Sequence, residues 1–358
     1  MKHIHRQVLE HLSSGAEAVL ATVTRSSGST PQKPGSSALF GSRGLIAGTV
    51  GGGLLEASVQ SLAREALDSG ISVQHVFNLD SSQGEEGARC GGEATVLIDA
   101  DPGAFLQVFK DLERTIAGGF AGILGTIVEM RDGRKAVIRR FWIPGEQGGR
   151  IPAGLQPDVQ DAVAETLGRD AGDDFLEFPL PAGHKVQKRA VFLQRIGPLP
   201  RLIIAGAGHV GRAVAHLGRL LEFEITVVDD RKELASRENV PDADYLVVRD
   251  MGQAMREIKL TGDTYVVIVT RGHRHDAEVL RPCIGAGAAY VGMIGSRHKV
   301  AAMRQEFIDK GWATPEQWDS IHTPIGLEIG SETVQEIAVS IAAQLVMERH
   351  RKRLEDEA

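Results

Sequence analysis

The chain has 358 residues, enough for two domains of ordinary size, and its apolar content of 42% is typical of soluble globular proteins. A formal net charge of −7 argues against a nucleic-acid-binding protein, which usually presents a basic face. Two cysteines are too few for a disulfide framework, and no apolar run has the length of a membrane span or the character of a signal peptide. We therefore expect a cytoplasmic protein with two domains.

The first part of the chain predicts a mixed α/β domain over residues 1–195. Turn residues from Arg25 to Gly35 and from Gly84 to Gly92 predict two loops within it. Apolar periodicity predicts helices over residues 2–12, 54–68, 105–116 and 159–167, and strands over 18–24, 38–40, 45–48, 73–79, 94–99, 121–130, 135–142 and 190–195.

The second part, residues 196–358, predicts a Rossmann-type domain. Short apolar strands alternate with helices, a pattern typical of a doubly wound parallel sheet that helices cover on both faces. The predicted strands are 201–205, 224–229, 245–248, 265–270 and 290–294, and the predicted helices begin near Val210, Glu233, Gly252, His275 and Lys299.

A glycine fingerprint follows the first strand of this second domain. Gly206, Gly208 and Gly211, with His209 between them, form a GxGxxG motif that opens a helix. The first glycine permits the tight turn, the second lets backbone amides reach a diphosphate, and the third allows close packing of helix on strand. The motif predicts a nucleotide site at the helix N-terminus, where negative charge is stabilised.

Two acidic residues, Asp229 and Asp230, end the next strand. Asp229 stands close to the position expected for a carboxylate that accepts hydrogen bonds from ribose hydroxyls. Such a carboxylate repels a 2′-phosphate, so NAD or another nucleotide is favoured over NADP. The alternative is a Rossmann scaffold that binds no nucleotide.

A second glycine run, Gly51, Gly52 and Gly53, lies between a predicted strand and a predicted helix. Backbone N–H groups that no side chain obstructs can converge there on an anion such as a phosphate. Glu56 follows in the first helical turn, where it either orients a bound ligand or simply stabilises the helix dipole. The alternative for the whole run is a tight structural turn.

Cys90 lies in a polar, glycine-rich stretch, and the neighbouring Arg89 favours the thiolate, which is the nucleophilic and metal-ligating form. The alternative is a small buried hydrophobic residue. We expect Cys283 to be such a packing residue. His273, His275 and Asp276 follow a strand of the second domain, where they could contact a ligand, bind a metal or favour a helix N-terminus.

Several of these segments together resemble the XdhC/CoxF family of accessory factors for xanthine dehydrogenase and related molybdenum hydroxylases. In the first domain the resemblance rests on residues 28–35, 48–56 and 90–92. In the second it rests on residues 206–211, 228–231, 290–299, 324–327 and 336–341.

The resemblance implies an accessory or maturation factor, a cofactor-binding chaperone more than a turnover enzyme. Such a factor binds molybdenum cofactor (molybdopterin or its dinucleotide form), assists its sulfuration with a cysteine desulfurase and delivers it to an apo molybdenum hydroxylase. In that picture Cys90 ligates molybdenum or carries sulfur, Gly51 to Gly53 cradle the pterin phosphate, and the Rossmann domain holds a nucleotide. A homodimer would shield the labile cofactor.

Two other functions stay open from the sequence. One is an NAD-dependent oxidoreductase that uses His209, His273 or His275 as acid or base. The other is a nucleotide-sensing interaction protein, since the glycine fingerprint also serves sites without redox chemistry.

Overall fold

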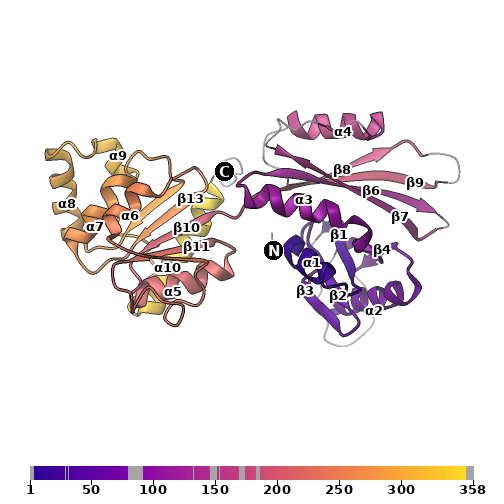
Figure 1. The fold of residues 1–358 in the computed structure, drawn as a ribbon, viewed down its shortest axis with the longest axis horizontal. Coiled ribbons are helices and arrows are strands. Elements are labelled where there is room, and N and C mark those ends of the chain that lie inside the picture. Colours follow the sequence, from indigo (N-terminus) through magenta and orange to yellow (C-terminus); the bar gives the residue numbers. More distant parts are fainter. Residues whose placement is uncertain are drawn as a thin grey trace. The chain divides into compact units, whose positions relative to one another are not determined.

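The computed structural model describes residues 4–28, 30, 32–79, 92–131, 133–145, 151–152, 154–168, 174–182 and 186–351. It divides into two compact units, Met1–Pro198 and Leu199–Ala358. The first contains an antiparallel nine-stranded sheet and the second a parallel five-stranded sheet (Figure 1). The predicted α/β fold class, a mixed domain followed by a Rossmann-type domain, is confirmed.

The strands of the first unit follow the order β3-β2-β1-β5-β4-β7-β6-β9-β8 in the sheet. Although β1 and β8 are far apart in that order, Arg25 of β1 forms an ion pair with Glu177 of β8, so the sheet curves strongly. The strands are β1 (Val19–Gly28), β2 (Ser37–Gly41), β3 (Gly44–Gly48), β4 (Val73–Asn78), β5 (Gly92–Asp99), β6 (Gly122–Arg131), β7 (Lys135–Pro144), β8 (Phe175–Leu180) and β9 (Lys188–Ile196).

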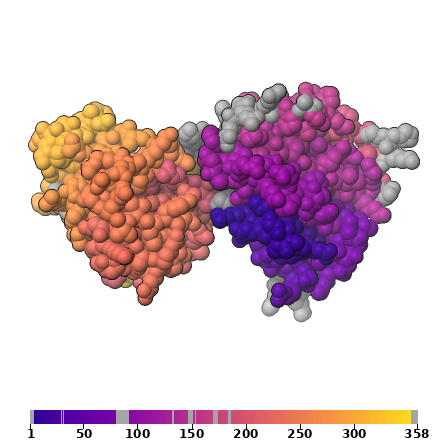
Figure 2. All heavy atoms as spheres, viewed as in Figure 1, coloured from indigo at the N-terminus to yellow at the C-terminus, as the bar shows by residue number. Residues whose placement is uncertain are grey.

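Helices cover this curved sheet through apolar residues at helical spacing. Leu55, Val59, Ala63 and Ala66 form the buried stripe of α2 (Gly53–Ser69), which packs on β1, β2 and β5. The surface of α1 lies beside that of α3 (Figure 2). The other helices of the unit are α1 (Ile4–Ser13), η1 (Pro102–Phe105), α3 (Leu106–Ala117) and α4 (Pro157–Gly168).

The structure of the first unit differs from the sequence analysis at two places. The loop predicted from Arg25 begins later, because β1 continues to Gly28 and pairs with β5 up to Gly92. Ladder hydrogen bonds outweigh the turn preference of Ser26 and Ser27, whose side chains stay at least partly accessible to water. The sequence predicted no element where β8 lies; β8 is an edge strand, where a proline such as Pro179 is tolerated.

The five strands of the second unit are all parallel, in the order β12-β11-β10-β13-β14. Helices α5 and α10 contribute to the core on one face of the sheet, and α6, α7, α8 and α9 contribute to the core on the other. The elements are β10 (Arg201–Ala205), α5 (His209–Leu220), β11 (Glu224–Asp229), β12 (Tyr245–Val248), α6 (Met251–Glu257), β13 (Thr264–Ile268), α7 (His273–Leu280), η3 (Arg281–Cys283), β14 (Tyr290–Met293), α8 (Arg297–Asp309), α9 (Pro315–Asp319) and α10 (Val334–Arg349).

The helix predicted near Glu233 was wrong, because turns follow β11 instead. The Ser236 hydroxyl donates to the Glu233 carbonyl and accepts from the Asn239 amide, so side chains replace helical backbone bonds. The Asn239 side-chain amide also donates to the carbonyls of Ala207 and Leu234, which ties this loop to the glycine fingerprint.

Candidate functional site

The carboxyl ends of the parallel strands form the candidate site of the second unit. The chain leaves β10 toward β11 on one side and returns to β13 on the other, so the strand order reverses between β10 and β13. Ligands of open α/β sheets bind in the crevice at such a reversal. The glycine fingerprint, Asp229, Asp230 and the start of α7 all lie at this edge of the sheet.

Two of the fingerprint glycines are required by the fold itself. Gly206 has a φ of +117°, and a Cβ atom there would lie 2.4 Å from the Val269 carbonyl oxygen. A Cβ atom on Gly211 would lie only 1.8 Å from the Gly206 carbonyl oxygen. Both glycines therefore allow backbone to approach backbone, as the sequence predicted.

Gly208 differs, because a Cβ atom there would meet nothing within 4 Å. Its φ of −72° is open to any residue, and it caps α5 without a side-chain hydrogen bond. No acidic residue stands in the first turn of α5, and His209 there is exposed. The open space and the uncompensated helix N-terminus fit the diphosphate of a nucleotide.

Asp229 is saturated by donors of the chain itself. Its Oδ1 accepts from the Arg231 amide at 3.0 Å and from Arg231 Nε at 2.8 Å. Its Oδ2 accepts from the Ala207 amide at 2.7 Å and from Arg231 Nη2 at 2.8 Å. These four bonds fill the acceptor positions of a carboxylate whose side chain is fully buried. In this structure Asp229 therefore anchors the glycine loop to β11.

The same bonds make the second unit sensitive to acid. Burial alone would raise the pKa of Asp229, but hydrogen bonds from Arg231 and from the Ala207 and Arg231 amides lower it to about 2, against an ordinary value of 3.8. Because the pKa is depressed on folding, the stabilisation is complete above pH 4 and is lost as the pH falls from about 4 to about 2.

We expect the stabilisation by Asp229 to be about 2 kcal/mol. Urea unfolding between pH 2 and pH 6, followed by hydrogen exchange in β10 to β14, measures it. The Asp229→Asn variant should be less stable at pH 6 and should lose less stability on acidification. Equal pH dependence in wild type and variant would contradict this role of Asp229.

Asp230 is the accessible carboxylate at this edge, with 32% of its side chain exposed. Its Oδ2 lies 2.9 Å from Arg271 Nη2, and its Oδ1 lies 3.8 Å from Arg231 Nε. Unlike Asp229, it can exchange partners when a ligand arrives. The ribose-binding role that the sequence assigned to Asp229 is therefore better suited to Asp230.

A third carboxylate, Asp276, is buried in the first turn of α7. It accepts from the Thr270 hydroxyl at 2.5 Å and forms an ion pair with Lys299 of α8. Asp276 thus connects the end of β13 to α8, the helix that follows β14. His275 is one-third exposed, and its Nδ1 lies 3.7 Å from Glu278, while the side chain of His273 is outside the described part of the structure.

Metal ligands do not gather in the part of the chain that the structure describes: no three His, Cys, Asp or Glu side chains lie there close enough to hold a metal ion. His275 and Asp276 accordingly form no metal cluster with other described residues. Among the described helices, none is long and apolar enough to cross a membrane.

Two hydrogen bonds stabilise the start of the glycine turn in the first unit. Glu56 Oε2 accepts from the Thr49 hydroxyl at 2.6 Å, and the Thr49 oxygen accepts from the Gly51 amide at 3.1 Å. The Gly51 amide is thereby used within the turn. Gly52 and Gly53 have φ values of +67° and +55°, and Cβ atoms on them would meet nothing within 4 Å. In this structure Glu56 fixes the turn, and the free surface lies at Gly52 and Gly53.

Cys90 and its neighbours lie outside the described residues, so the structure gives it no environment. The described residues on either side are joined, because the Leu79 amide donates to the Gly92 carbonyl at 2.8 Å. Cys283, in contrast, is buried, and its thiol donates to the Val279 carbonyl. Burial raises the pKa of Cys283 to about 12, and its predicted role as a packing residue is confirmed.

An open hollow of about 400 Å³ lies at the carboxyl end of β1. The size is within the range of small-molecule sites. Pro34 lies within one of the segments on which the family resemblance rests, and Glu93 adjoins another. The remaining lining residues are Thr24, Arg25, Ser26, Ser27, Phe175 and Glu177.

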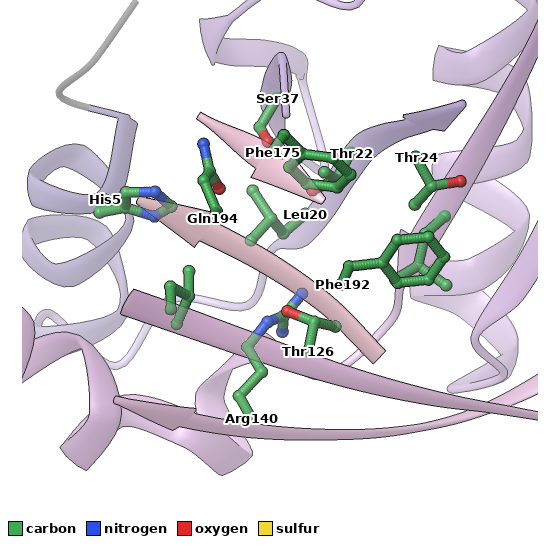
Figure 3. Close-up of a pocket in the computed structure, with 12 residues that line it drawn as sticks. His5, Leu20, Thr22, Thr24, Ser37, Thr126, Arg140, Phe175, Phe192 and Gln194 are labelled. Carbon is green, nitrogen blue, oxygen red and sulfur yellow. Dashed lines mark hydrogen bonds between the residues drawn. The ribbon is translucent and has the colours of Figure 1, made fainter. Parts of the chain in front are cut away.

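A second pocket lies inside the curved sheet, and both apolar and polar side chains line it (Figure 3). His5, Thr126, Arg140 and Gln194 approach it from different elements. Its volume of about 20 Å³ has room for about one water molecule, so it cannot hold a pterin.

Sequence reasoning missed the basic side chains of the crevice. Arg231, Arg271 and Lys299 each pair with a carboxylate at the carboxyl edge of the sheet. The available signal was their position, since each directly follows a strand or stands in the first turn of a helix at that edge.

Comparison with known proteins identifies the class. Residues 202–345 match the XdhC Rossmann domain, and residues 11–78 match the XdhC and CoxI family. The chain belongs to the XdhC and CoxI family, which confirms the resemblance.

Individual relatives agree with this assignment. The chain is 27% identical to a probable xanthine dehydrogenase subunit of Bacillus subtilis (strain 168) over 354 residues, which cover 98% of this chain and 99% of that protein. It is 36% identical over 158 residues to "Uncharacterized protein YqeB" of Escherichia coli (strain K12), covering 44% of this chain and 29% of that protein.

The fold also matches a crystal structure described as a xanthine dehydrogenase from Bacillus halodurans, with a TM-score of 0.75 and 23% identity. The match covers 97% of this chain and 96% of the other. At that identity the likeness concerns the fold.

Proposed function

We propose that this protein is a cytoplasmic accessory factor that binds molybdenum cofactor and assists its sulfuration and insertion into a xanthine dehydrogenase-like hydroxylase. The family membership supports the molybdenum-hydroxylase context. The main support for cofactor or nucleotide binding is that the N-terminus of α5 has no side-chain cap and borders open space at Gly208. An anionic group fits there without any change in the fold.

Each unit, taken by itself, has residues suited to a ligand. Amides at Gly208 and His209 would hold a diphosphate, and Asp230 would accept from a ribose. In the first unit, the hollow beside Pro34 and Glu93 has the size for a pterin, and the free turn at Gly52 suits a phosphate. When bound, the cofactor supplies the molybdenum centre whose terminal ligand is exchanged for sulfur, and Cys90 would ligate the metal or carry that sulfur.

The proposed partners are a cysteine desulfurase and the apo form of a molybdenum hydroxylase, with the chain acting as a homodimer. The nucleotide of the crevice would be NAD or another nucleotide. Turnover of reduced nicotinamide would instead favour an oxidoreductase.

The activation of an apo-hydroxylase tests this proposal. Apo-enzyme is incubated with molybdenum cofactor, a cysteine desulfurase and cysteine, with or without this protein, and hydroxylase activity is then measured. We expect wild type to raise the recovered activity at least about tenfold and Cys90→Ala to lose most of the gain. Cys283→Ser is the matched control. Activation that does not depend on wild-type protein would contradict the proposal.

A further inference from the structure

One ion pair crosses the glycine loop of the second unit. Arg271 follows β13 and Asp230 follows β11, while β10 lies between these two strands in the sheet. The pair therefore connects two strands that are not neighbours, with 2.9 Å between Arg271 Nη2 and Asp230 Oδ2. The side chains meet beyond the carboxyl end of β10, where Gly206 to Gly208 begin the turn into α5.

Three ion pairs described above lie at the carboxyl edge of the sheet. Of these, the pair of Arg271 with Asp230 is the one whose side chains can change partners. Asp229 and Asp276 are fully buried, and each is held by an ion pair and by further hydrogen bonds. Arg271 and Asp230 are 47% and 32% exposed. An exposed ion pair contributes little to stability, so its partners separate at small cost. Arg231 and Lys299 are committed to buried carboxylates, whereas Arg271 can change partner.

We propose that Arg271 is a diphosphate-binding residue of the crevice: Asp230 holds its guanidinium beside the glycine loop until a diphosphate takes the place of the carboxylate. This inference rests on the proposed nucleotide-binding function. A guanidinium can bind phosphate oxygens through two parallel hydrogen bonds, whereas Arg271 donates one hydrogen bond to Asp230 in this structure. The amides of α5 approach the diphosphate from one side and Arg271 from the β13 side, so each phosphate gains a partner.

The exchange also changes Asp230. Once Arg271 turns to the diphosphate, the Asp230 carboxylate is free to accept hydrogen bonds from a ribose. Without a ligand, the ion pair neutralises both charges in the crevice. When a nucleotide binds, Arg271 contacts its diphosphate and Asp230 contacts its ribose.

Replacing Arg271 and replacing Asp230 should have opposite effects on the affinity for pyrophosphate, which has no ribose. Binding of inorganic pyrophosphate and of CDP is measured by calorimetry at low salt for wild type, Arg271→Gln and Asp230→Asn. We expect Arg271→Gln to weaken both ligands by about 10- to 100-fold. Asp230→Asn removes the competitor of pyrophosphate and should strengthen its binding several-fold. Arg249→Gln breaks an exposed pair with Glu257 in the same unit and serves as the control.

The outcomes separate this inference from the proposed function. If Arg271→Gln binds both ligands as wild type does, while Gly208→Ala weakens CDP, the role of Arg271 is refuted and the nucleotide site stands. A wild type that binds neither ligand overturns both. Weakening by both Arg271→Gln and Asp230→Asn toward pyrophosphate would make the pair a structural contact and would also refute the exchange.

Discussion

Replacing Gly211 by alanine should destabilise the second unit by about 3 kcal/mol, at the upper end of the range for overpacking. The new Cβ atom would lie 1.8 Å from the Gly206 carbonyl oxygen, which is rigid backbone and cannot turn aside. Helix α5 would have to move away from β10 and open the core that Val214 and Ala215 form. Urea unfolding followed by hydrogen exchange in β10 to β14 measures the loss.

The matched variant Gly208→Ala should leave the fold almost unchanged. Its Cβ atom meets nothing within 4 Å, and alanine in place of glycine at a helix cap costs no more than about 1 kcal/mol. The methyl group would enter the space proposed for a diphosphate, so CDP or NAD binding should weaken at least about tenfold. If Gly208→Ala lost as much stability as Gly211→Ala, the fold would need both glycines, and the assignment of Gly208 to ligand binding alone would be contradicted.

Replacing Asp99 by asparagine should destabilise the first unit by about 3–5 kcal/mol, because it leaves the buried charge of Arg140 without a counter-ion. The side chains of Arg140 and Asp99 are 3% and 2% exposed. Asp99 also accepts from the Asp101 amide at 3.1 Å, and the Arg140 guanidinium stacks near the Phe105 and Phe109 rings. The pair therefore links β5, β7 and the start of α3.

Hydrogen exchange in β5 and β7 during urea unfolding reports this loss. The control is Arg114→Gln, which breaks an exposed pair with Asp111 and should change stability by less than about 1 kcal/mol. A double replacement, Asp99→Leu with Arg140→Met, should recover part of the loss since no lone charge is left buried. If Asp99→Asn were as stable as the Arg114→Gln control, the proposed role of Asp99 as the counter-ion of Arg140 would be contradicted.

The parallel sheet could be predicted closely because its signal is local. The spans of β10, β11 and β12 agree with the apolar runs, since each strand is short and bounded by turn residues or glycine, and β10 and β11 are largely buried. The curved antiparallel sheet was harder to predict. Its curvature brings together residues such as Arg25 and Glu177, which are 152 residues apart and leave no periodic pattern in the sequence.

The sequence placed the candidate site at the ends of the strands, but it could not show which of the two carboxylates, Asp229 or Asp230, stays accessible to a ligand. Asp229 and Asp230 are adjacent, and both fit the expected spacing. Only the fold shows that Arg231 turns back onto Asp229 and that Arg271 arrives from β13 to meet Asp230. Likewise, Glu56 looked like a ligand residue because its bond to Thr49, seven residues earlier, depends on the turn between them.

The most direct measurement is the molybdenum and pterin content of the protein after incubation with molybdenum cofactor and removal of free cofactor by gel filtration. We expect wild type and Cys283→Ser to retain molybdenum and pterin close to one equivalent each, and Cys90→Ala to lose most of the metal. If none of the three proteins retains pterin while NAD binds tightly, the account is wrong, and an oxidoreductase becomes the function to pursue.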